Sequence, residues 1–444
     1  MKTILISSFH ILISRNIIAT GVPARLASQG CRIVVVAPDY KRAYFEEHFG
    51  GKGVVIEAVD ANVPTRTRRG RFFKRLAQNM LDTRTVELKQ KQRRYFSRRW
   101  FAYFLFWLPA RLAWHVPGAI RSARAVDYIT APAGPFPGLL ERYRPDLVFA
   151  TDIQNENDVA LLQAARRRGV RTVGMVRSWD NLTNYLLRIV PDLLLVGTDL
   201  EREEAKHYHG VPAERIRVVG IPHYDRYRAA LKEPRDAFLR SLGLDPAKKL
   251  ITFTPIGNRY IRHNDTDRRV MDILAAMPEV NVIVRFPPAD EVSHTDDFVA
   301  PQHMHLDRPG VGFKDALVRR REISEEDDRR LMHELYHSDI VVTGPSSIAV
   351  DAALFGKPVI AVDLYVSERP YWERCICYDY LHIGYVRERK SMRIVRNDDE
   401  LHEWVRRYLA DSTIDAEGRR RVARDLCGSA DGRSVERIVK LLST

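Results

Sequence analysis

The feature that most constrains the fold is a regular alternation of short apolar runs with helix-like stretches along both halves of the chain. Such runs occur at 3–8, 32–38 and 146–152 in the first half, and at 250–255 and 339–343 in the second. They are rich in Val, Ile and Leu, as buried strands are. Strands that alternate with helices form parallel sheets. We therefore predict an α/β protein with doubly wound parallel sheets.

The two series of runs predict two Rossmann-like domains that face each other across a cleft. Residues 1–225 hold the first series, which an insert at 62–125 interrupts, and residues 226–248 form a helical connector. Residues 249–415 hold the second series, and residues 416–444 are predicted to form closing helices. A chain of 444 residues is long enough for two such cores.

Composition excludes several classes of protein. Apolar residues make up 45% and charged residues 29%, as in soluble globular proteins. The 4 cysteines are too few for a disulfide framework in a chain of this size, which suits a reducing cytosol. The apolar run near the start is too short for a signal peptide, and no run reaches the ~18 residues of a membrane span. We expect a cytoplasmic protein.

Positive charge gathers in one segment, where residues 66–99 hold thirteen Lys and Arg against Asp82 and Glu87. The aromatic run "WFAYFLFWLPARLAW" follows at 100–114. Basic residues bind anionic head groups and aromatic rings settle at the acyl boundary, so this segment predicts binding to an anionic membrane surface. The alternative is a buried helical insert with a solvated basic face. Nucleic acid is not expected, since no nucleic-acid motif accompanies the charge. The residues predicted to meet the membrane or its acceptor are Arg93, Arg94, Arg98, Arg99, Trp100, Phe104 and Trp107.

The stretch "GPSSIAVDAALFGKPVIAVD" at 344–363 follows one apolar run and ends in another. Its spacing predicts a strand, a tight turn, a helix over 346–355 that stops at Gly356, and a second strand. In a parallel sheet such a turn lies at the carboxyl ends of the strands, where ligands bind. Free N–H groups there could hold a phosphate, and Asp351 could accept hydrogen bonds from a ribose. The alternative is an ordinary βαβ unit with a serine cap.

This stretch and "HYHGVPAERIRVVGIPHYD" at 207–225 together resemble the GT-B glycosyltransferase superfamily. The nearest motifs are those of bacterial CDP-glycerol glycerophosphotransferases and UDP-N-acetylglucosamine 2-epimerases. The resemblance covers roughly residues 190–420, is weaker over the first 60, and is absent from the insert. It implies an N-terminal acceptor domain and a C-terminal donor domain. It also assigns the donor diphosphate to Gly344, Ser346 and Ser347, and the ribose to Asp351.

Two further segments enter through the same resemblance. The loop at 252–265 would contact the phosphates, with Gly257 allowing close approach and Asn258 and Arg259 offering donors. A surface loop with a stray arginine is the alternative. In "VIVRFPP", Arg285 matches a family Arg-Pro-His-Pro element, but Phe-Pro stands in place of Pro-His. That difference weakens a polyol-phosphate transferase interpretation.

The candidate general base is Asp180, in "MVRSWDNLTN" after a strand of the first series. The glycerophosphotransferases carry Trp-His-Gly at what resembles the same place. His10 is the rival, because many sugar transferases of this fold use a histidine just after the first strand. Either group could accept a proton from an acceptor hydroxyl. The alternatives are a turn cap for Asp180 and a satisfied loop histidine for His10.

No metal site is predicted. The segment "HELYH" at 333–337 matches the zincin pattern, but no third ligand follows at a recognisable distance. Cys375 and Cys377 are expected to pack in the interior. The chain also lacks a P-loop and a G-x-G-x-x-G sequence.

These observations predict a glycosyltransferase that moves a sugar from a nucleotide-sugar co-substrate to a lipid-linked or other membrane-held glycan acceptor. It would need no cofactor or metal and would act in cell-envelope or surface polysaccharide biosynthesis, peripheral on the inner face of the membrane. One alternative is a nucleotide-sugar 2-epimerase, for which Asp152, Glu156 and Asp180 are candidate acids. The others are a polyol-phosphate transferase and a binding protein that kept the fold. The sequence does not identify the base, the sugar, the acceptor or the stereochemical outcome.

Overall fold

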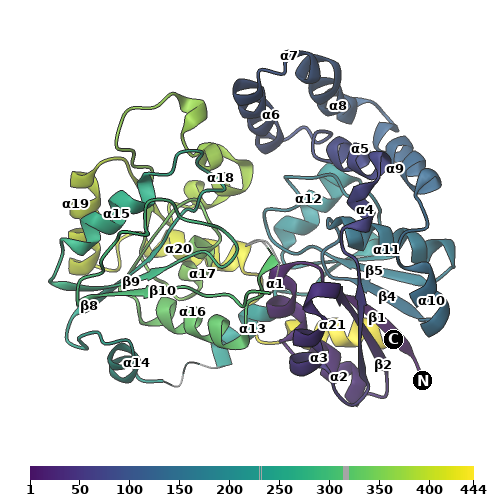
Figure 1. The fold of residues 1–444 in the computed structure, drawn as a ribbon, viewed down its shortest axis with the longest axis horizontal. Coiled ribbons are helices and arrows are strands. Elements are labelled where there is room, and N and C mark those ends of the chain that lie inside the picture. The colour runs from purple at the N-terminus through teal and green to yellow at the C-terminus, as the bar shows by residue number, and fades with distance from the viewer. Residues whose placement is uncertain (230, 232, 314–319) are drawn as a thin grey trace. The chain divides into compact units, whose positions relative to one another are not determined.

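The computed structural model describes residues 1–229, 231, 233–313 and 320–444. Strands and helices alternate along both halves, as Figure 1 shows. The chain divides into two compact units. Unit 1 comprises Met1–Arg226 and Gly428–Thr444, and unit 2 comprises Tyr227–Cys427.

Unit 1 is built on a seven-stranded sheet in which every strand pair is parallel. The strand order is β3-β2-β1-β4-β5-β6-β7, so the order reverses between β1 and β4. In register, Ile4 of β1 pairs with Ile33 on one side and Leu147 on the other. The strands are β1 (Thr3–Ser7), β2 (Arg32–Pro38), β3 (Val54–Val59), β4 (Leu147–Ala150), β5 (Arg171–Met175), β6 (Leu193–Val196) and β7 (Ile216–Val218).

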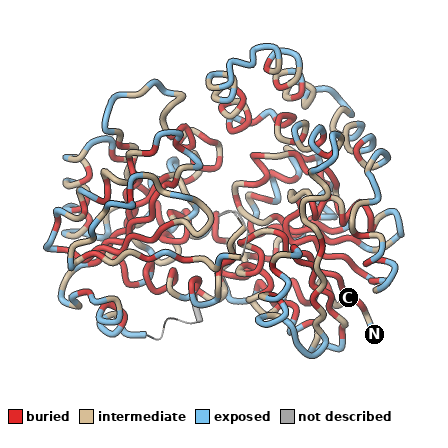
Figure 2. The backbone as a smooth tube through the Cα atoms, in the orientation of Figure 1, coloured by how far each residue is buried: buried red, intermediate tan, exposed pale blue. Residues whose placement is uncertain are grey.

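Apolar clusters cover both faces of this sheet, and its central segments are red, which marks buried residues, in Figure 2. Side chains alternate across a strand. Ile4 and Ile6 therefore join one apolar cluster, while Leu5 joins the cluster on the opposite face. The covering helices are α2 (Val22–Ser28), α3 (Arg42–Phe49) and α21 (Ser434–Ser443) on the first face, and α10 (Pro137–Tyr143), α11 (Glu156–Arg167) and α12 (Asp199–His209) on the second.

The helix limits follow local sequence signals. Helix α12 begins with a capping box, in which Thr198 accepts from the N–H of Glu201 and Glu201 accepts from the N–H of Thr198. It ends at Gly210, whose φ of 60° favours glycine. The closing helix α21 returns to unit 1, where Val435, Ile438 and Leu442 enter the core beside α2.

The insert of unit 1 is helical throughout most of its length. Ala77 of α5, Val86 of α6 and Met80 and Leu81 between these helices form a small apolar cluster that also contains Leu186. No helix in the described residues is both long and apolar enough to cross a bilayer. The helices are α4 (Val63–Arg66), α5 (Arg68–Ala77), α6 (Arg84–Ser97), α7 (Trp100–Ala102), α8 (Leu108–Leu112) and α9 (Ala119–Thr130), with a π-helical turn at Tyr103–Trp107 between α7 and α8.

Unit 2 has a six-stranded parallel sheet in the order β10-β9-β8-β11-β12-β13, which reverses between β8 and β11. This is the order of a doubly wound nucleotide-binding domain. The strands are β8 (Lys249–Thr254), β9 (Val280–Arg285), β10 (Met304–Asp307), β11 (Ile340–Thr343), β12 (Val359–Val362) and β13 (Arg393–Val395). The helices are α14 (Arg235–Ser241), α15 (Thr266–Ala275), α16 (Glu325–His337), α17 (Ile348–Leu354), α18 (Leu381–Glu388), α19 (Asp398–Ala410) and α20 (Ala416–Leu426). The predicted fold class, two parallel-sheet α/β domains, is confirmed.

Candidate functional site

In unit 2 the two predicted donor loops lie side by side. They follow β8 and β11, which are paired at the point where the strand order reverses. At their start, Thr254 Oγ1 donates a hydrogen bond to Thr343 Oγ1 at 2.6 Å. A Cβ atom on Gly344 would lie 2.4 Å from the side chain of Ile256, so only glycine lets the two loops pack this closely. This edge of a doubly wound sheet is where such domains bind ligands.

The turn after β11 exposes the two serines differently. Ser347 is exposed and directly precedes α17, and its side chain makes no capping hydrogen bond. Ser346 is half-buried, and its Oγ accepts from the N–H of Ile348 at 3.3 Å and lies 3.0 Å from Thr343 Oγ1. Helix α17 begins at Ile348, two residues later than predicted, because Ser346 and Ser347 complete the turn. It ends before Gly356, whose φ is 68°.

Asp351 lies in the first turn of α17 and is 3% exposed. Its backbone N–H donates to Ser347 O at 3.0 Å. On the same helix the carbonyl of Val350 accepts from Cys427 Sγ, and α20 packs alongside. The structure therefore places Asp351 just behind the turn, and its contact with a ribose stays a prediction.

The loop after β8 is held by one buried carboxylate. Asp267 of α15 accepts from the N–H groups of Ile256 and Gly257 at 2.8 and 2.9 Å. Burial raises the pKa of Asp267, although these hydrogen bonds oppose the rise. Gly257 has a φ of 80°, and a Cβ there would lie 2.5 Å from Asp290 Oδ2. The N–H of Gly257 is thus bonded to the protein itself.

The next two residues of the loop differ in hydrogen bonding and in exposure. Asn258 Oδ1 accepts from the backbone N–H of Ser293 at 3.1 Å. Arg259 is exposed, and its guanidinium lies 6.0 Å from the ring centre of Tyr260. Of the three predicted loop residues, Arg259 is the exposed one at this edge of the sheet.

Arg285, at the end of β9, points into the interior of unit 2. Its guanidinium pairs with Asp307 at 2.6 Å and Glu334 at 3.2 Å, and it donates to Asp327 O at 2.8 Å. Burial raises the pKa of Glu334 to about 8, while Arg285 opposes the rise. These contacts make Arg285 part of a buried charge network, and its predicted contact with a donor stays a prediction.

The zincin-like segment lies on α16. His333 and His337 stack on Phe238 with ring centres 5.7 and 5.2 Å from it. Glu334, the glutamate of the pattern, faces Arg285 instead. In the described part of the chain, no group of three His, Cys, Asp or Glu side chains is arranged to hold a metal ion.

In unit 1, Asp180 lies in the loop after β5, which runs from 176 to 192 without a helix. Asn184 Nδ2 donates to Asp180 Oδ2 at 3.2 Å and to its carbonyl at 2.7 Å. Burial lowers the pKa of Arg177, but the charges of Asp152 and Asp180 outweigh it and the pKa is raised. Asp180 is therefore a half-buried carboxylate beside a cation.

His10, the rival base, caps the short helix α1 (Ile11–Ile13) after β1. Its Nδ1 accepts from the N–H of Leu12 at 3.2 Å. A neutral imidazole that accepts at Nδ1 carries its proton on Nε2. Neither nitrogen of that tautomer offers a free lone pair while the cap is in place, and the choice between Asp180 and His10 as the base stays a prediction.

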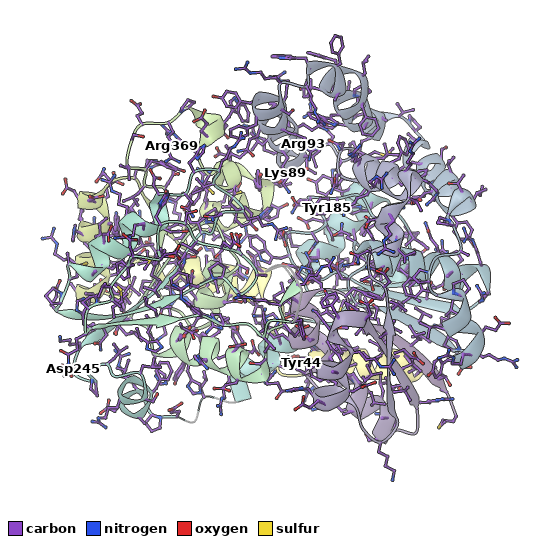
Figure 3. All side chains as sticks on the ribbon, viewed as in Figure 1. Tyr44, Lys89, Arg93, Tyr185, Asp245 and Arg369 are labelled. Atoms are coloured by element: carbon purple, nitrogen blue, oxygen red, sulfur yellow. The ribbon has the colours of Figure 1, made fainter. Side chains whose placement is uncertain are left out.

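Sequence reasoning missed the link between the insert and the Asp180 loop. Lys89 of α6 donates to Asn184 Oδ1 at 2.5 Å, and its ammonium lies 5.3 Å from the ring centre of Tyr185. Lys89 and Tyr185 are labelled in Figure 3, where they lie close together. Thr83 Oγ1 also donates to Thr183 O at 2.8 Å. These contacts join residues about a hundred positions apart in the sequence, and no local sequence pattern predicts them.

The aromatic part of the insert divides into an exposed set and a buried set. Phe101 is 84% exposed, Leu105 is 76% exposed, and Trp100 and Phe104 are also exposed. Trp107 is only 7% exposed and packs edge-on against Tyr103. The predicted membrane-facing position of Trp107 is thus corrected: this ring faces the interior of the insert.

Several arginines lie next to these rings. The guanidinium of Arg94 lies 4.7 Å from the ring centre of Trp100, and that of Arg93 lies 5.0 Å from Trp107. Arg98 and Arg99 are exposed between α6 and α7. Exposed basic and aromatic side chains therefore share one end of the insert.

Comparison with known sequences gives a match to part of the chain. The profile of the family described as CDP-Glycerol:Poly(glycerophosphate) glycerophosphotransferase matches residues 315–444, which include the 344–347 turn and Asp351. No curated protein sequence gives a significant match.

Solved structures match over the whole length. The S. aureus MnaA–UDP structure has a TM-score of 0.55 at 14% identity, covering 100% of this chain and 96% of that one. UDP-GlcNAc 2-epimerase from Neisseria meningitidis bound to UDP-GlcNAc has a TM-score of 0.54 at 12% identity, covering 100% and 99%. A glycotransferase of kitacinnamycin has a TM-score of 0.51 at 11% identity, covering 99% and 98%. With its two parallel sheets and these neighbours, the chain has the GT-B fold found in glycosyltransferases and UDP-GlcNAc 2-epimerases.

Proposed function

We propose that this protein is a glycosyltransferase that moves a sugar from a nucleotide-sugar donor to the hydroxyl of a membrane-held acceptor. The observation that carries the proposal is the pairing of the two loops after β8 and β11 at the switch point of unit 2. The similarity to structures that hold UDP or UDP-GlcNAc supports a nucleotide-sugar donor.

The donor would be held by unit 2. Ser346, Ser347 and the exposed Arg259 offer hydroxyl and guanidinium donors to a diphosphate, and Asp351 would accept from the ribose. Helix α17 has only 7 residues, so the side chains and loop backbone would carry most of this binding. The leaving diphosphate would be stabilised by these donors, and we propose that no metal is needed.

The chemical step would use Asp180 of unit 1. Its carboxylate would take the proton of the acceptor hydroxyl as the oxygen attacks the anomeric carbon. The bond from that carbon to the diphosphate breaks in the same step, and the nucleoside diphosphate leaves with the electron pair. The hydrogen bond from Asn184 and the nearby Arg177 would keep Asp180 ionised and oriented.

The exposed end of the insert would bring the enzyme to an anionic membrane, where a lipid-linked acceptor is concentrated. Phe101, Phe104 and Leu105 supply apolar contact, and Arg98 and Arg99 supply positive charge. We therefore propose a peripheral location on the inner face of the cell membrane and a role in cell-envelope or surface polysaccharide synthesis.

Two other reactions have specific support. The profile match over 315–444 favours a polyol-phosphate transferase that uses CDP-glycerol. The structural neighbours favour a nucleotide-sugar 2-epimerase, although Asp152 and Glu156 are already paired with Arg177 and Arg188. A binding protein that kept the fold would bind nucleotide without turnover.

A panel of ligands tests these proposals together. The melting temperature is measured with UDP, UDP-GlcNAc, other nucleotide sugars and CDP-glycerol, because a bound ligand stabilises the folded chain. A saturable rise with one nucleotide sugar supports the glycosyltransferase, and a rise with CDP-glycerol alone favours the polyol-phosphate transferase. Release of nucleoside diphosphate that depends on an acceptor, persists in EDTA and is lost in Asp180→Asn would establish the transfer. No response to any nucleotide would contradict it.

A further inference from the structure

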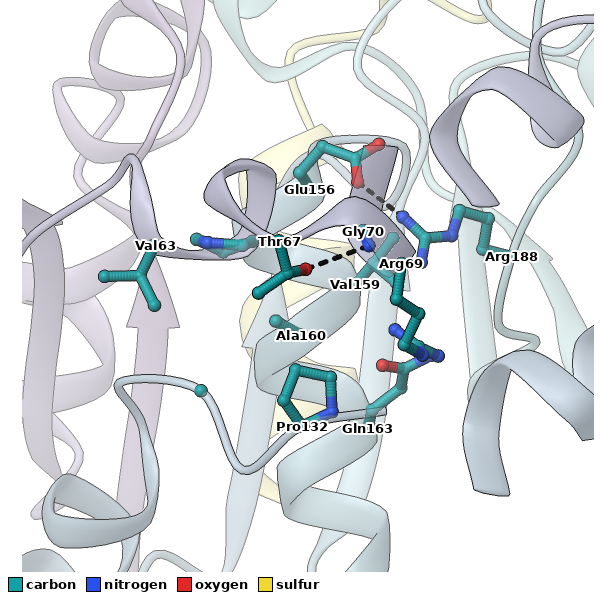
Figure 4. Close-up of a pocket in the computed structure, with 12 residues that line it drawn as sticks. Val63, Thr67, Arg69, Gly70, Pro132, Glu156, Val159, Ala160, Gln163 and Arg188 are labelled. Atoms are coloured by element: carbon teal, nitrogen blue, oxygen red, sulfur yellow. Dashed lines mark hydrogen bonds and ion pairs between the residues drawn. The ribbon is translucent and has the colours of Figure 1, made fainter. Parts of the chain in front are cut away.

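Unit 1 contains a cavity of about 180 Å³ between the insert and helix α11. Figure 4 shows part of its walls, with Val63, Thr67, Arg69 and Gly70 of the insert and Val159, Ala160 and Gln163 of α11. Pro132 and Gly134 also line it. This volume is enough for several water molecules or for one small polyatomic ion. None of the residues predicted for donor binding or for the base lines it.

One buried side chain in the wall has an unused donor. Gln163 of α11 is 3% exposed and lines the cavity. Among the residues that the structure describes, its Nε2 has no hydrogen-bond partner. Buried polar groups are nearly always hydrogen-bonded, so this amide indicates a partner with acceptor atoms inside the cavity.

Two arginines in the walls share one carboxylate. Arg188 donates to Asp127 through Nε at 2.8 Å and through a terminal nitrogen at 2.9 Å, and it also pairs with Glu156. Arg69 pairs with the same Asp127 at 2.5 Å and donates to Thr130 Oγ1 at 2.8 Å. Asp127 thus fixes both guanidinium groups in place beside the cavity.

The charged residues that line the cavity are two cations, Arg69 and Arg188, and one anion, Glu156. Arg69 and Arg188 face the carboxylates of Asp127 and Glu156, which balance them. Two more cations act on this cluster: Lys74 lowers the pKa of Glu156 against the rise caused by burial, and Arg167 adds to the burial that lowers the pKa of Arg69. The remaining wall is apolar, with Val159 and Ala160.

We propose that this cavity binds a small oxyanion, a phosphate or a carboxylate group. Gln163 Nε2 would donate one hydrogen bond, and Arg69 and Arg188 would supply charge from fixed positions. The carboxylate of Glu156 bounds the site and is kept from repelling the ion by its pairing with Arg188. The proposal concerns unit 1 and does not depend on the glycosyl transfer, whose donor loops belong to unit 2.

The test measures binding of inorganic phosphate and of acetate by calorimetry, in a chloride buffer that holds ionic strength constant and contains a fixed concentration of UDP. Wild-type protein should bind at least one of the two ions saturably, and the ion that binds identifies the oxyanion. Gln163→Glu should weaken that binding at least tenfold, because a carboxylate replaces the amide donor. The matched control is Gln29→Glu, which adds the same charge at an exposed residue of unit 1 and should bind like wild type.

Ala160→Leu provides a second variant, since it fills the cavity without changing any charge. If Gln163→Glu does not fold, Ala160→Leu alone should abolish the binding that wild type shows. Equal binding by wild type, Gln163→Glu and Ala160→Leu would overturn the proposal, as would the absence of saturable binding to both ions. UDP binding in the same samples is read separately, so loss of the oxyanion site and failure of the donor site give different results.

Discussion

Lys89 Nζ donates to Asn184 Oδ1 at 2.5 Å, while Asn184 Nδ2 donates to Asp180 Oδ2 at 3.2 Å. A cation of the insert is therefore connected through one amide to the proposed base. An amide that donates to a carboxylate favours its ionised form, and the lysine polarises that amide. The insert thus has a role in positioning Asp180, in addition to its exposed surface.

Asn184→Leu should raise the pKa of Asp180, because the ionised carboxylate loses a hydrogen bond. The acid limb of the kcat/KM profile against pH should move to higher pH. In addition, kcat at neutral pH should fall by about 10-fold or more, because Asn184 no longer holds the carboxylate in position. Lys89→Met should shift the profile in the same direction by less. Lys91→Met removes the same charge from α6, where Lys91 pairs with Glu87, and should leave the profile unchanged. If the pH profiles of all three variants matched that of wild type, Asn184 would not position the base.

Asp351→Ala should weaken UDP binding by about 1–3 kcal/mol, the cost of leaving ribose hydroxyls without a charged partner. Calorimetry measures the affinity, and the melting temperature without nucleotide shows whether the buried substitution disturbs the fold. Asp236→Ala is the control, since Asp236 is an exposed carboxylate of the same unit. Unchanged UDP affinity in a folded Asp351→Ala protein would remove Asp351 from the donor site.

Glu334 should make stability depend on pH. Its folded pKa of about 8 lies above the ordinary value of 4.5, so the folded state holds a proton that the unfolded state has released. The free energy of unfolding should therefore fall as pH rises from about 4.5 to 8, with a slope of at most about 1.4 kcal/mol per pH unit from this group. Glu334→Gln, which resembles the protonated side chain, should flatten this dependence. Urea titrations at several pH values measure it, and an equal slope in both proteins would contradict the assignment.

The sequence predicted β8, β11 and β12 of unit 2 and the turn between β11 and α17, because buried parallel strands and glycine-bounded turns have strong local signals. The short strands β10 and β13 were not predicted, and the family resemblance, rather than a local signal, placed the loop after β8 beside that turn. The Thr254–Thr343 contact follows directly from that topology. The partners of Arg285 could not be predicted in the same way. Asp307 and Glu334 belong to β10 and α16, and only the folded sheet brings them to β9.

The insert shows a second limit of sequence reasoning. Trp100 and Trp107 are seven residues apart, a spacing that places both on one face of a regular α-helix. The π-helical turn at Tyr103–Trp107 widens the helix by one residue and changes this register. Trp100 stays exposed while Trp107 turns inward. The loop around Asp180 has no periodicity either, so its contacts with the insert had no sequence signal.

The exposed tip of the insert should bind anionic membranes. Liposomes with phosphatidylserine should carry the protein to the top of a flotation gradient at low salt, and neutral liposomes should carry less. High salt should release part of the protein, because screening weakens the pull of the basic residues on the head groups. The fraction that stays bound at high salt should depend on apolar contact.

The double variant Phe101→Ser and Leu105→Ser separates apolar insertion into the bilayer from nonspecific adsorption to liposomes. Both side chains are more than three-quarters exposed, so replacing them should not disturb packing, and each buried apolar side chain lost from the acyl boundary weakens binding by about 1.5–3 kcal/mol. The salt-resistant fraction should therefore disappear while low-salt binding to anionic liposomes partly remains. The control replaces Val299 and Val366, which are exposed in unit 2, and should float like wild type. If the Phe101 and Leu105 variant floats like wild type under every condition, the tip does not enter the bilayer. If wild type binds anionic and neutral liposomes equally, the insert serves only to position the Asp180 loop. A soluble acceptor then becomes the better proposal.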